Sequence, residues 1–289
     1  MSKTRIRMTI TPLSSAMGAE VTGIDAATMN DADFAALREA LHEYKMLAVR
    51  GQSLAPAAQT AFSRRFGEIQ YHINSEHKIP GQPEVLTLST EIRDGKNVGI
   101  PDAGSDWHSD HAYVDRPTAY TILQSITVPK AGGDTEWTNM AAAYDALDSG
   151  MKARLEGLIG INSFNRYRNP RMTRPTRHAN PEQYFAERSP PDAFHPIVRT
   201  HPVTGVKCLF VSPRFTIGIK GMDDTEAQLL LDRIFAHIAN RDFVYHHKWR
   251  PGDLVMWDNR QTLHLACGGV KAPEIRHMHR STVLGEVPF

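Results

Sequence analysis

The feature that most constrains the fold is the succession of strand-like segments after residue 106. Short apolar or alternating runs occupy residues 107–114, 119–128, 134–138, 207–211, 243–249, 254–257, 262–266 and 275–284, and such runs favour β-strands. Earlier in the chain, residues 6–10, 46–49 and 85–88 have the same character. Helical segments do not alternate with these strands as they would in a parallel βαβ sheet. The sequence therefore predicts a mostly β fold with flanking helices.

Four segments have helical periodicity. Residues 31–44 carry an apolar stripe behind a capping residue, Asn30 or Asp31. Residues 56–66 end before Gly67, which is typical of a helix C-terminus. Residues 141–158 are helical in pattern with a break near Gly150, and residues 223–239 form the most clearly amphipathic segment of the chain.

Composition and length describe an ordinary globular chain. It has 289 residues, of which 41% are hydrophobic and 22% charged, as expected for a soluble protein with a sizeable core. The formal net charge of +1 gives no reason to expect nucleic acid or a membrane surface as a partner. We find no internal repeat and no low-complexity linker. We therefore expect a single domain that spans residues 1–289.

The expected location is cytoplasmic. Cys208 and Cys267 are the only cysteines, which excludes a disulfide framework and fits a reducing compartment. Residues 1–12 are basic but lack the apolar core of a signal peptide. No run of 18 apolar residues exists, so no membrane span is expected. We also expect the chain to form a homo-oligomer.

Residues 165–196 differ from the rest of the chain. They hold five prolines before Pro196 and six arginines, at positions 166, 168, 171, 174, 177 and 188. A long irregular segment in a compact domain is often a lid or a binding loop. A solvated surface loop explains the same composition equally well.

A possible metal site begins with the sequence Trp107-His108-Ser109-Asp110. In an extended segment His108 and Asp110 would point to the same side, so both could reach one metal ion. The natural third ligand is His264, far downstream. Two histidines and one carboxylate suit non-haem Fe(II) that activates O2. With 14 histidines and 32 acidic residues in the chain, a chance pair of surface or core residues is the alternative.

Several other catalytic motifs are absent. The sequence contains no phosphate-binding loop of the Walker type and no GxGxxG motif after a strand. It also lacks the HExxH helix of zinc proteases and the GxSxG elbow of serine hydrolases. Nucleotide chemistry and acyl transfer are therefore disfavoured.

The order of motifs along almost the whole chain resembles the taurine / 2,4-dichlorophenoxyacetate dioxygenase family, which depends on Fe(II) and 2-oxoglutarate. The resemblance implies a double-stranded β-helix, or jelly roll, with helices packed outside. The motifs that carry it occur at residues 11–13, 18–23, 50–52, 66–68, 107–110, 132–136, 199–202, 252–260 and 278–285.

The resemblance also implies roles for individual residues. His108, Asp110 and His264 would hold iron. Arg276 would pair with the distal carboxylate of 2-oxoglutarate, for which a planar guanidinium is well suited, and Thr135 would join that contact. Substrate-binding positions would be Arg280, which faces an anionic group of the substrate, together with His72, Tyr113 and Phe215.

Each of these roles has a structural alternative. Arg276 and Arg280 could be solvated strand charges, and His72 could be a surface histidine. His111 follows Asp110 directly, so an extended segment would place it on the opposite side. In the taurine enzyme an asparagine stands four residues before the first ligand, where this chain has Gly104.

Two further departures concern the substrate. His111 and Tyr113 stand where the taurine enzyme has valine and phenylalanine. These differences argue against taurine as the substrate. Segments such as residues 142–147 and 242–245 are more similar to the aryloxyacetate branch of the family.

The predicted reaction is hydroxylation of a small anionic organic molecule, a carboxylate or a sulfonate, with release of succinate and CO2. Arg280 supports the anion, because a second inward arginine needs a counter-charge and only Glu274 and Glu286 lie near it in sequence. Two alternatives remain: another oxidative outcome at the same site, such as desaturation, or a non-enzymatic jelly-roll module that binds metal or anions.

Overall fold

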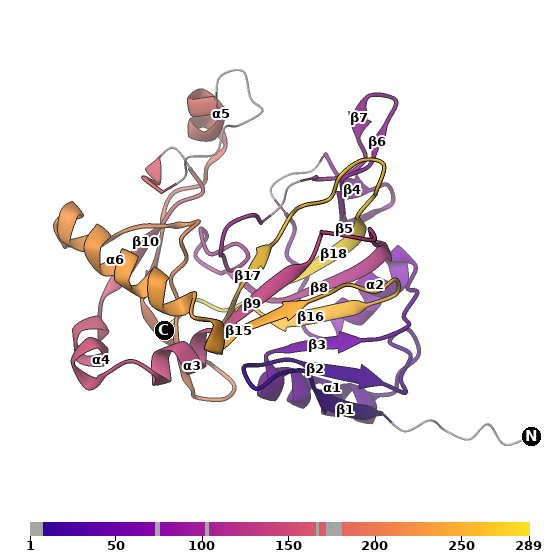
Figure 1. Ribbon diagram of the computed structural model, residues 1–289, viewed down its shortest axis with the longest axis horizontal. Helices are drawn as coiled ribbons and strands as arrows, with labels where there is room; N and C mark the ends of the chain where they lie inside the picture. Colours follow the sequence, from indigo (N-terminus) through magenta and orange to yellow (C-terminus); the bar gives the residue numbers. More distant parts are fainter. Residues whose placement is uncertain (1–7, 73–75, 102–103, 166–167, 172–180) are drawn as a thin grey trace, which may run out of the picture.

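The computed structural model describes residues 8–72, 76–101, 104–165, 168–171 and 181–289, and sheets make up most of it (Figure 1). The largest sheet has the strand order β1-β2-β3-β16-β8-β18-β5-β4. Its neighbouring strands are antiparallel, except that β2 and β3 are parallel. The strands are β1 (Thr9–Pro12), β2 (Ala19–Thr22), β3 (Met46–Val49), β4 (Lys78–Ile79), β5 (Gln82–Ser89), β8 (Thr118–Thr127), β16 (Leu254–Asp258) and β18 (His277–Leu284). The prediction of a mostly β fold with flanking helices is confirmed.

A three-stranded sheet packs against the inner face of the large one. Its order is β15-β9-β17, and both pairs are antiparallel. Trp137 of β9 meets Trp257 of β16 edge to face, with 5.4 Å between the ring centroids. The strands are β9 (Thr135–Asn139), β15 (Val244–His247) and β17 (Thr262–Ala266). The face of β9 and β17 that carries Trp137 therefore points towards the large sheet, and we call it the inner face.

Smaller sheets complete the strand inventory of the described residues. One has the order β11-β10-β14, and two are hairpin-like pairs, β12-β13 and β6-β7. Their bounds are β6 (Ile92–Arg93), β7 (Lys96–Asn97), β10 (Ile159–Asn162), β11 (Ala193–Pro196), β12 (Val198–Thr200), β13 (Lys207–Leu209) and β14 (Thr216–Ile219).

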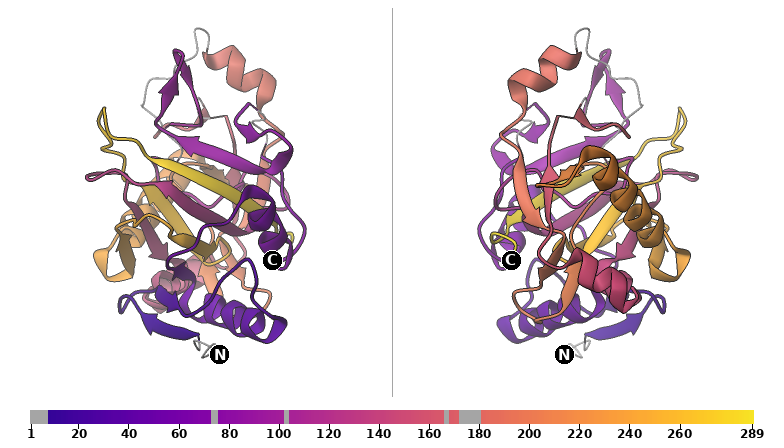
Figure 2. Two further views of the ribbon diagram at one scale, coloured as in Figure 1. Left: turned by 90° about the vertical axis from the view of Figure 1, so that its right-hand side faces the viewer. Right: turned by 90° about the vertical axis from the view of Figure 1, so that its left-hand side faces the viewer.

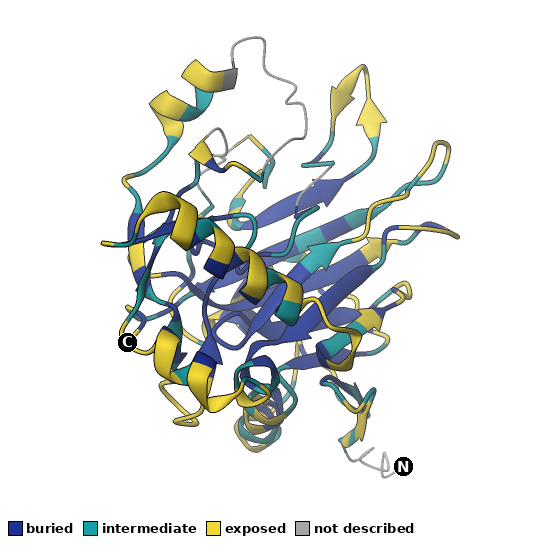
Figure 3. Ribbon diagram, turned by 60° about the vertical axis from the view of Figure 1, so that its left-hand side comes forward, coloured by how far each residue is buried: buried dark blue, intermediate teal, exposed yellow. Residues whose placement is uncertain are grey.

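Helices cover the two outer sides of this sheet assembly. α1 (Asp31–Tyr44) and α2 (Pro56–Arg64) bury Phe34 and Phe62 against the large sheet. α3 (Met140–Asp145), α4 (Ser149–Leu155) and α6 (Asp224–Ile238) lie on the other side and share a core with Leu263 of β17. In the opposed views of Figure 2, α2 is in front in one and α6 in the other. Figure 3 shows the exposed outer side of α6 over buried strands.

Local sequence signals predicted the simplest elements well. Asn30 caps α1 by accepting a hydrogen bond from the Asp33 backbone N–H, as expected for an N-cap residue. All residues of β3 are buried, which explains its uninterrupted apolar run. The expected strand at 6–10 begins only at Thr9, and its first two positions lie outside the described residues.

Three expected elements differ from the structure. Residues 141–158 form two helices that separate at 146–148, because Asp148 caps α4 through the Met151 backbone N–H. Residues 107–114 are not a strand: after one bridge at His108 the chain turns, and His111 has a left-handed backbone with φ 53°. The segment 165–196 contains α5 (Pro181–Arg188) and β11, and its residues 166–167 and 172–180 lie outside the described part.

Candidate metal centre and its surroundings

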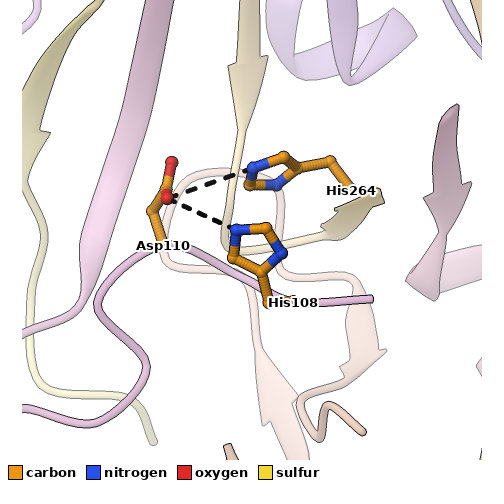
Figure 4. A group of neighbouring side chains, drawn as sticks. All are labelled: His108, Asp110 and His264. Carbon is orange, nitrogen blue, oxygen red and sulfur yellow. Dashed lines mark ion pairs between the residues drawn. The ribbon is translucent and has the colours of Figure 1, made fainter. Parts of the chain in front are cut away.

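His108, Asp110 and His264 converge in the interior (Figure 4). One donor atom from each lies within 4.8 Å of the others. The Oδ1 atom of Asp110 lies 3.8 Å from His108 Nε2 and 4.0 Å from His264 Nε2. The exposed fractions of the three residues are 7% or less. The structure therefore brings together the three predicted metal ligands.

The convergence arises from a bridge and a turn rather than from a strand. His108 and His264 exchange backbone hydrogen bonds of 3.1 and 2.8 Å, which attach the first ligand to the free edge of β17. The chain then turns at Ser109 and Asp110, so the carboxylate approaches from the side. The sequence correctly predicted that His108 and Asp110 lie close together. It was wrong to expect this from one face of a strand, because a turn brings the two side chains together.

Each side chain of the triad is oriented by a further contact or by close packing. His108 Nδ1 lies 2.8 Å from the Asp106 carbonyl oxygen and donates its proton there, which leaves the Nε2 lone pair for a metal. Asp110 Oδ2 accepts a hydrogen bond of 2.6 Å from the Thr121 hydroxyl, so Oδ1 faces the histidines. The His264 ring lies against Trp257, with 4.8 Å between the centroids.

Asn259 holds the turn that carries Asp110. Its side-chain oxygen accepts from the Asp110 backbone N–H at 3.2 Å and from Trp257 Nε1 at 3.0 Å. Its amide nitrogen donates to the Thr121 hydroxyl at 2.9 Å. The same asparagine therefore positions both the backbone and, through Thr121, the carboxylate of the candidate ligand.

The electrostatics of the triad favour the forms that bind metal. Burial lowers the pKa of His264 to about 4 and holds the pKa of His108 well below its ordinary value. Burial alone would raise the pKa of Asp110, but the Arg280 guanidinium and the two histidines outweigh it and hold that pKa well below the usual range. At neutral pH the site offers two neutral imidazoles and one carboxylate, a donor set that fits Fe(II).

Arg276 and Thr135 lie at one end of this site. Thr135 pairs with Ala266, two residues from His264, so its side chain shares the inner face of β9 and β17 with the triad. Arg276 Nε donates to the Gly133 carbonyl oxygen at 2.9 Å, and its guanidinium lies 5.6 Å from the Trp249 ring centroid. Trp249 Nε1 in turn donates to the Thr135 hydroxyl at 3.0 Å.

The guanidinium of Arg276 lacks a carboxylate partner within 4.0 Å among the described residues. Burial lowers its pKa to about 10, and Asp134 and Cys267 only partly offset this. Gly133 allows the close approach of the arginine, because a Cβ there would lie 2.9 Å from Arg276 Cδ. An incoming carboxylate would therefore stabilise this charge.

Arg280 points to the triad itself. It comes from β18, is 8% exposed, and its Nη1 lies 3.3 Å from Asp110 Oδ1. The inference that Arg280 has no acidic partner is therefore wrong. Only residues close to Arg280 in the sequence were considered as partners. Asp110 contacts the arginine across the interior from a position 170 residues away.

Aromatic side chains form a wall beside Arg280 and the triad. Tyr113 lies between Phe164 and Phe215, with centroid distances of 4.7 and 5.0 Å, and Phe215 contacts the His108 ring at 6.0 Å. Tyr113 and Phe215, which the resemblance gave as substrate-binding positions, therefore lie beside the triad. His72 joins them through His111, whose ring centroid lies 5.3 Å away.

His111 does not point away from the site as an extended segment would require. Its left-handed backbone turns the ring towards His72 and Tyr113. Its Nδ1 lies 2.8 Å from the Thr118 hydroxyl, while its buried Nε2 has no hydrogen-bond partner in the described part of the chain.

Sequence reasoning missed three contributors to the site, Thr121, Asn259 and Arg214, and noted Gly104 only as a departure from the taurine enzyme. Thr121 and Asn259 act on Asp110, and Gly104 packs against His108, where a Cβ would lie 2.6 Å from the ring Cε1. Arg214 stacks on Phe215 at 5.3 Å and lowers the pKa values of both metal-site histidines. Of the three that were missed, only Asn259 carried a visible signal, since it lies in the family-like segment 252–260.

A donor set of two histidines and one carboxylate, in a β fold and beside an unpaired arginine, is typical of non-haem iron oxygenases. The comparisons agree. The family described as "Taurine catabolism dioxygenase TauD, TfdA family" matches residues 9–282. The chain belongs to this family, whose named members are α-ketoglutarate-dependent dioxygenases that use Fe(II), 2-oxoglutarate and O2.

Individual relatives are similar over most of their length. The chain is 33% identical over 258 residues to the (S)-phenoxypropionate/alpha-ketoglutarate-dioxygenase of Sphingobium herbicidovorans, covering 89% of this chain and 88% of that protein. The crystal structure of a taurine dioxygenase from Burkholderia xenovorans superposes with a TM-score of 0.81 at 31% identity, covering 97% and 92% of the two chains. The structure of AAD-2 with Mn(II) and N-oxalylglycine gives 0.77 at 29% identity, covering 98% and 99%.

One further observation concerns membranes. Within the described residues, none of the helices is both long and apolar enough to cross a bilayer.

Proposed function

We propose that this chain hydroxylates a small anionic organic substrate, using Fe(II) held by His108, Asp110 and His264 and 2-oxoglutarate held by Arg276 and Thr135. The observation that carries the proposal is the buried triad with an unpaired guanidinium beside it. Bound iron would supply the oxidising chemistry, in which 2-oxoglutarate is converted to succinate and CO2 while O2 is consumed. The chain's own residues bind, orient and exclude water.

Arg276 would receive the distal carboxylate of 2-oxoglutarate. Its Nε is already held by the Gly133 carbonyl oxygen, which leaves the two terminal nitrogens for a bidentate contact. The Thr135 hydroxyl accepts from Trp249 and therefore keeps its own proton available for a carboxylate oxygen. The Trp249 ring covers the guanidinium and keeps water from one of its faces.

Arg280 would bind the anionic group of the primary substrate. With Asp110 assigned to the metal, one net positive charge remains among five groups: the divalent ion, Asp110, Arg276, Arg280 and dianionic 2-oxoglutarate. Arg214, which lies nearer the aromatic wall, is not part of this count. A monoanionic substrate neutralises the remaining charge, which favours binding in a site of low dielectric. Tyr113 and Phe215 would contact the organic part, and the His72 ring would close the wall beside His111.

The relatives support this substrate class only indirectly. Phenoxypropionate and taurine, named for two of them, are a carboxylate and a sulfonate. Gly104 leaves no room for the asparagine of the taurine enzyme, because even a Cβ would contact the His108 ring. We therefore favour an anion that makes no hydrogen bond at this position.

We also propose the finer architecture. The packing of β15-β9-β17 on the eight-stranded sheet, with the triad between them, supports a double-stranded β-helix in a single domain of residues 1–289. A homo-oligomer and a cytoplasmic location stay predictions.

We propose that the segment 165–196 acts as a lid. Phe185 of α5 contacts Phe164 at 5.8 Å, and Phe164 contacts Tyr113 at 4.7 Å, which links the segment to the aromatic wall. Within the segment, Arg168 pairs with Asp192 through two contacts of 2.8 and 2.6 Å, which join its two ends to each other. Limited trypsin digestion should cleave after Arg188 more slowly when metal and 2-oxoglutarate are bound; an unchanged rate would make this a passive surface segment.

Substrate-dependent succinate release tests the main proposal. Purified protein with Fe(II), 2-oxoglutarate and O2 should release succinate when supplied with members of a panel of aryloxy carboxylates, sulfonates and sulfate esters. Arg280→Gln should raise the KM of the best substrate by about 10²-fold, the effect of losing a buried charge-assisted contact, while the 2-oxoglutarate dependence changes little.

Two controls decide between the alternatives. Methyl esters of the best substrates should turn over poorly in the wild-type protein, and equal turnover of ester and acid would refute the anionic subsite. Product analysis separates hydroxylation from desaturation. The remaining outcome is that the wild-type protein releases no more succinate than His108→Ala, either with the panel compounds or with 2-oxoglutarate as the sole organic substrate. In that case a non-enzymatic binding module becomes the better description.

A further inference from the structure

A second cluster of metal-binding side chains lies on the opposite face of the strands that carry Thr135 and His264. His246 of β15 and Leu265 of β17 are the cross-strand partners of Glu136 on β9. Residues two positions apart share a strand face, so Asp134 and Cys267 extend the same row, and the Cys267 backbone N–H donates to the Asp134 carbonyl oxygen at 2.9 Å. The register therefore brings four potential ligands to one outer face.

Their donor atoms are close enough to share one ion. The candidate ligand atoms of Glu136, His246 and Cys267 all lie within 4.8 Å of one another. His246 Nδ1 lies 3.0 Å from Glu136 Oε1, and its Nε2 lies 2.8 Å from Asp134 Oδ2. Neither cysteine belongs to the interior triad, so the two clusters are chemically distinct.

We propose that Glu136, His246 and Cys267 form a second metal site, selective for Zn²⁺ and similar thiolate-binding ions, with Asp134 as the positioning residue for His246. Nitrogen, sulfur and oxygen donors together suit tetrahedral Zn²⁺, whose fourth position would be filled by water. A thiolate ligand favours Zn²⁺ or Co²⁺ over Mg²⁺. This site lies outside the proposed oxygenase chemistry.

The hydrogen bonds of His246 support this assignment. A histidine that binds a metal through one ring nitrogen commonly donates its other N–H to a carboxylate, which fixes the ring. Here Nδ1 faces Glu136, the proposed ligand, and Nε2 faces Asp134. The hydrogen bond to Glu136, and then that to Asp134, raise the pKa of His246, so a proton competes with the ion for this nitrogen.

Metal binding at this site must release protons. The pKa of the Cys267 thiol is raised to about 11, by burial and by the charges of Glu136 and Asp134. The ion therefore displaces the thiol proton and the Nδ1 proton of His246, and its apparent affinity should increase with pH. Arg241 competes with the ion, since its Nη2 lies 2.8 Å from the same Glu136 oxygen.

Titration of the apo protein with Co²⁺ tests the site directly. A cysteine thiolate bound to Co²⁺ gives a charge-transfer absorption in the near ultraviolet that the interior triad, which lacks sulfur, does not produce. We expect this absorption in the wild-type protein and in Cys208→Ala, and its loss in Cys267→Ala. Zn²⁺ should abolish it by displacement.

Two further variants sharpen the result. His246→Gln should weaken Co²⁺ binding by about 10-fold or more, and Arg241→Ala should strengthen it by about twofold to fivefold, the effect of removing an exposed ion pair. Both positions are exposed, so circular dichroism should show native folds. Absence of the thiolate absorption in the wild-type protein, or its persistence in Cys267→Ala, would overturn the proposal, and neither outcome depends on the chemistry of the interior triad.

Discussion

Asp110 is oriented by side chains that lie far from it in the sequence. The Thr121 hydroxyl donates to Oδ2, Asn259 accepts from the Asp110 backbone, and Arg280 contacts Oδ1. A carboxylate oriented in this way needs no rearrangement to receive a metal, which is the usual role of groups behind the ligands. Single substitutions in this set should therefore change metal affinity more than stability.

Thr121→Val should lower the affinity for Fe(II) or Mn²⁺ by about 10-fold to 100-fold. Valine retains the shape of threonine but removes the donor to Asp110 Oδ2 and leaves the Asn259 amide without its acceptor. Thr121→Ser keeps the hydroxyl and serves as the matched control. Calorimetric titration of the chelator-treated protein measures the difference; equal affinities for the two variants would contradict the assigned role.

Arg276→Leu should raise the concentration of 2-oxoglutarate needed for half-maximal turnover by about 10²-fold or more. In the proposed function this arginine is the cation that binds the co-substrate, and leucine offers no charge. Arg276→Lys keeps the charge but loses the planar fork, so it should be intermediate. The measurement is succinate formation as a function of 2-oxoglutarate concentration. An unchanged dependence in the leucine variant would mean that 2-oxoglutarate does not bind at Arg276.

At the scale of elements, the segment 104–108 acts as a further partner of β17. Gly104 accepts from the Ala266 backbone N–H at 2.8 Å, and His108 exchanges two hydrogen bonds with His264. Gly104 has φ +85°, and a Cβ there would lie 2.6 Å from His108 Cε1. The segment can therefore lie over the His108 ring only because this position lacks a side chain.

Gly104→Ala should lower metal affinity by about 10-fold or more, because the methyl group must displace the His108 ring. Gly95→Ala is the matched control: its φ of +73° imposes similar backbone strain, but its Cβ would meet nothing within 4 Å. Metal titration and thermal melting of both variants separate displacement of the ligand from loss of stability. Similar metal affinities in Gly104→Ala and Gly95→Ala would show that the His108 ring accommodates the methyl group without any loss of metal binding.

On the scale of the whole molecule, several histidines are buried in the interior in their neutral form. Burial lowers the pKa of His111 and His264 to about 4, and the pKa of His108 is lowered in the same direction. In the unfolded chain each would titrate near its ordinary pKa of about 6.5. The unfolded state therefore binds more protons than the folded state below that pH, and acid should favour unfolding.

The unfolding free energy of the metal-free protein should fall as the pH decreases from about 6.5 towards 4, by up to about 1.4 kcal/mol per pH unit for each such histidine. Urea unfolding in the presence of a chelator measures it. His111→Asn, which tolerates the left-handed backbone, should reduce the slope by about one proton. His246, whose pKa is raised, acts in the opposite sense only above about pH 6.5. A flat profile, or the same slope in His111→Asn, would mean that these rings are protonated in the fold.

Much of this protein follows from short-range patterns in its sequence. The helix behind Asn30, the buried run of β3, the mostly β character and the family-like motifs around His108 and His264 all depend on neighbouring residues, whose spacing directly determines capping, strand formation and burial. The motif order was specific enough to indicate the three side chains that the fold brings together as a candidate metal centre.

Tertiary structure alone decided how these residues meet. The left-handed turn at His111 was not visible in the sequence. Asp110 accepts a hydrogen bond from the Thr121 hydroxyl, donates its backbone N–H to Asn259 and pairs with Arg280, and these contacts join positions about ten to 170 apart. Such contacts depend on how strands are ordered and registered in the sheets, and one position of register reverses the face of every side chain. For that reason the counter-charge of Arg280, and the row formed by Glu136, His246 and Cys267, could be found only in the folded chain.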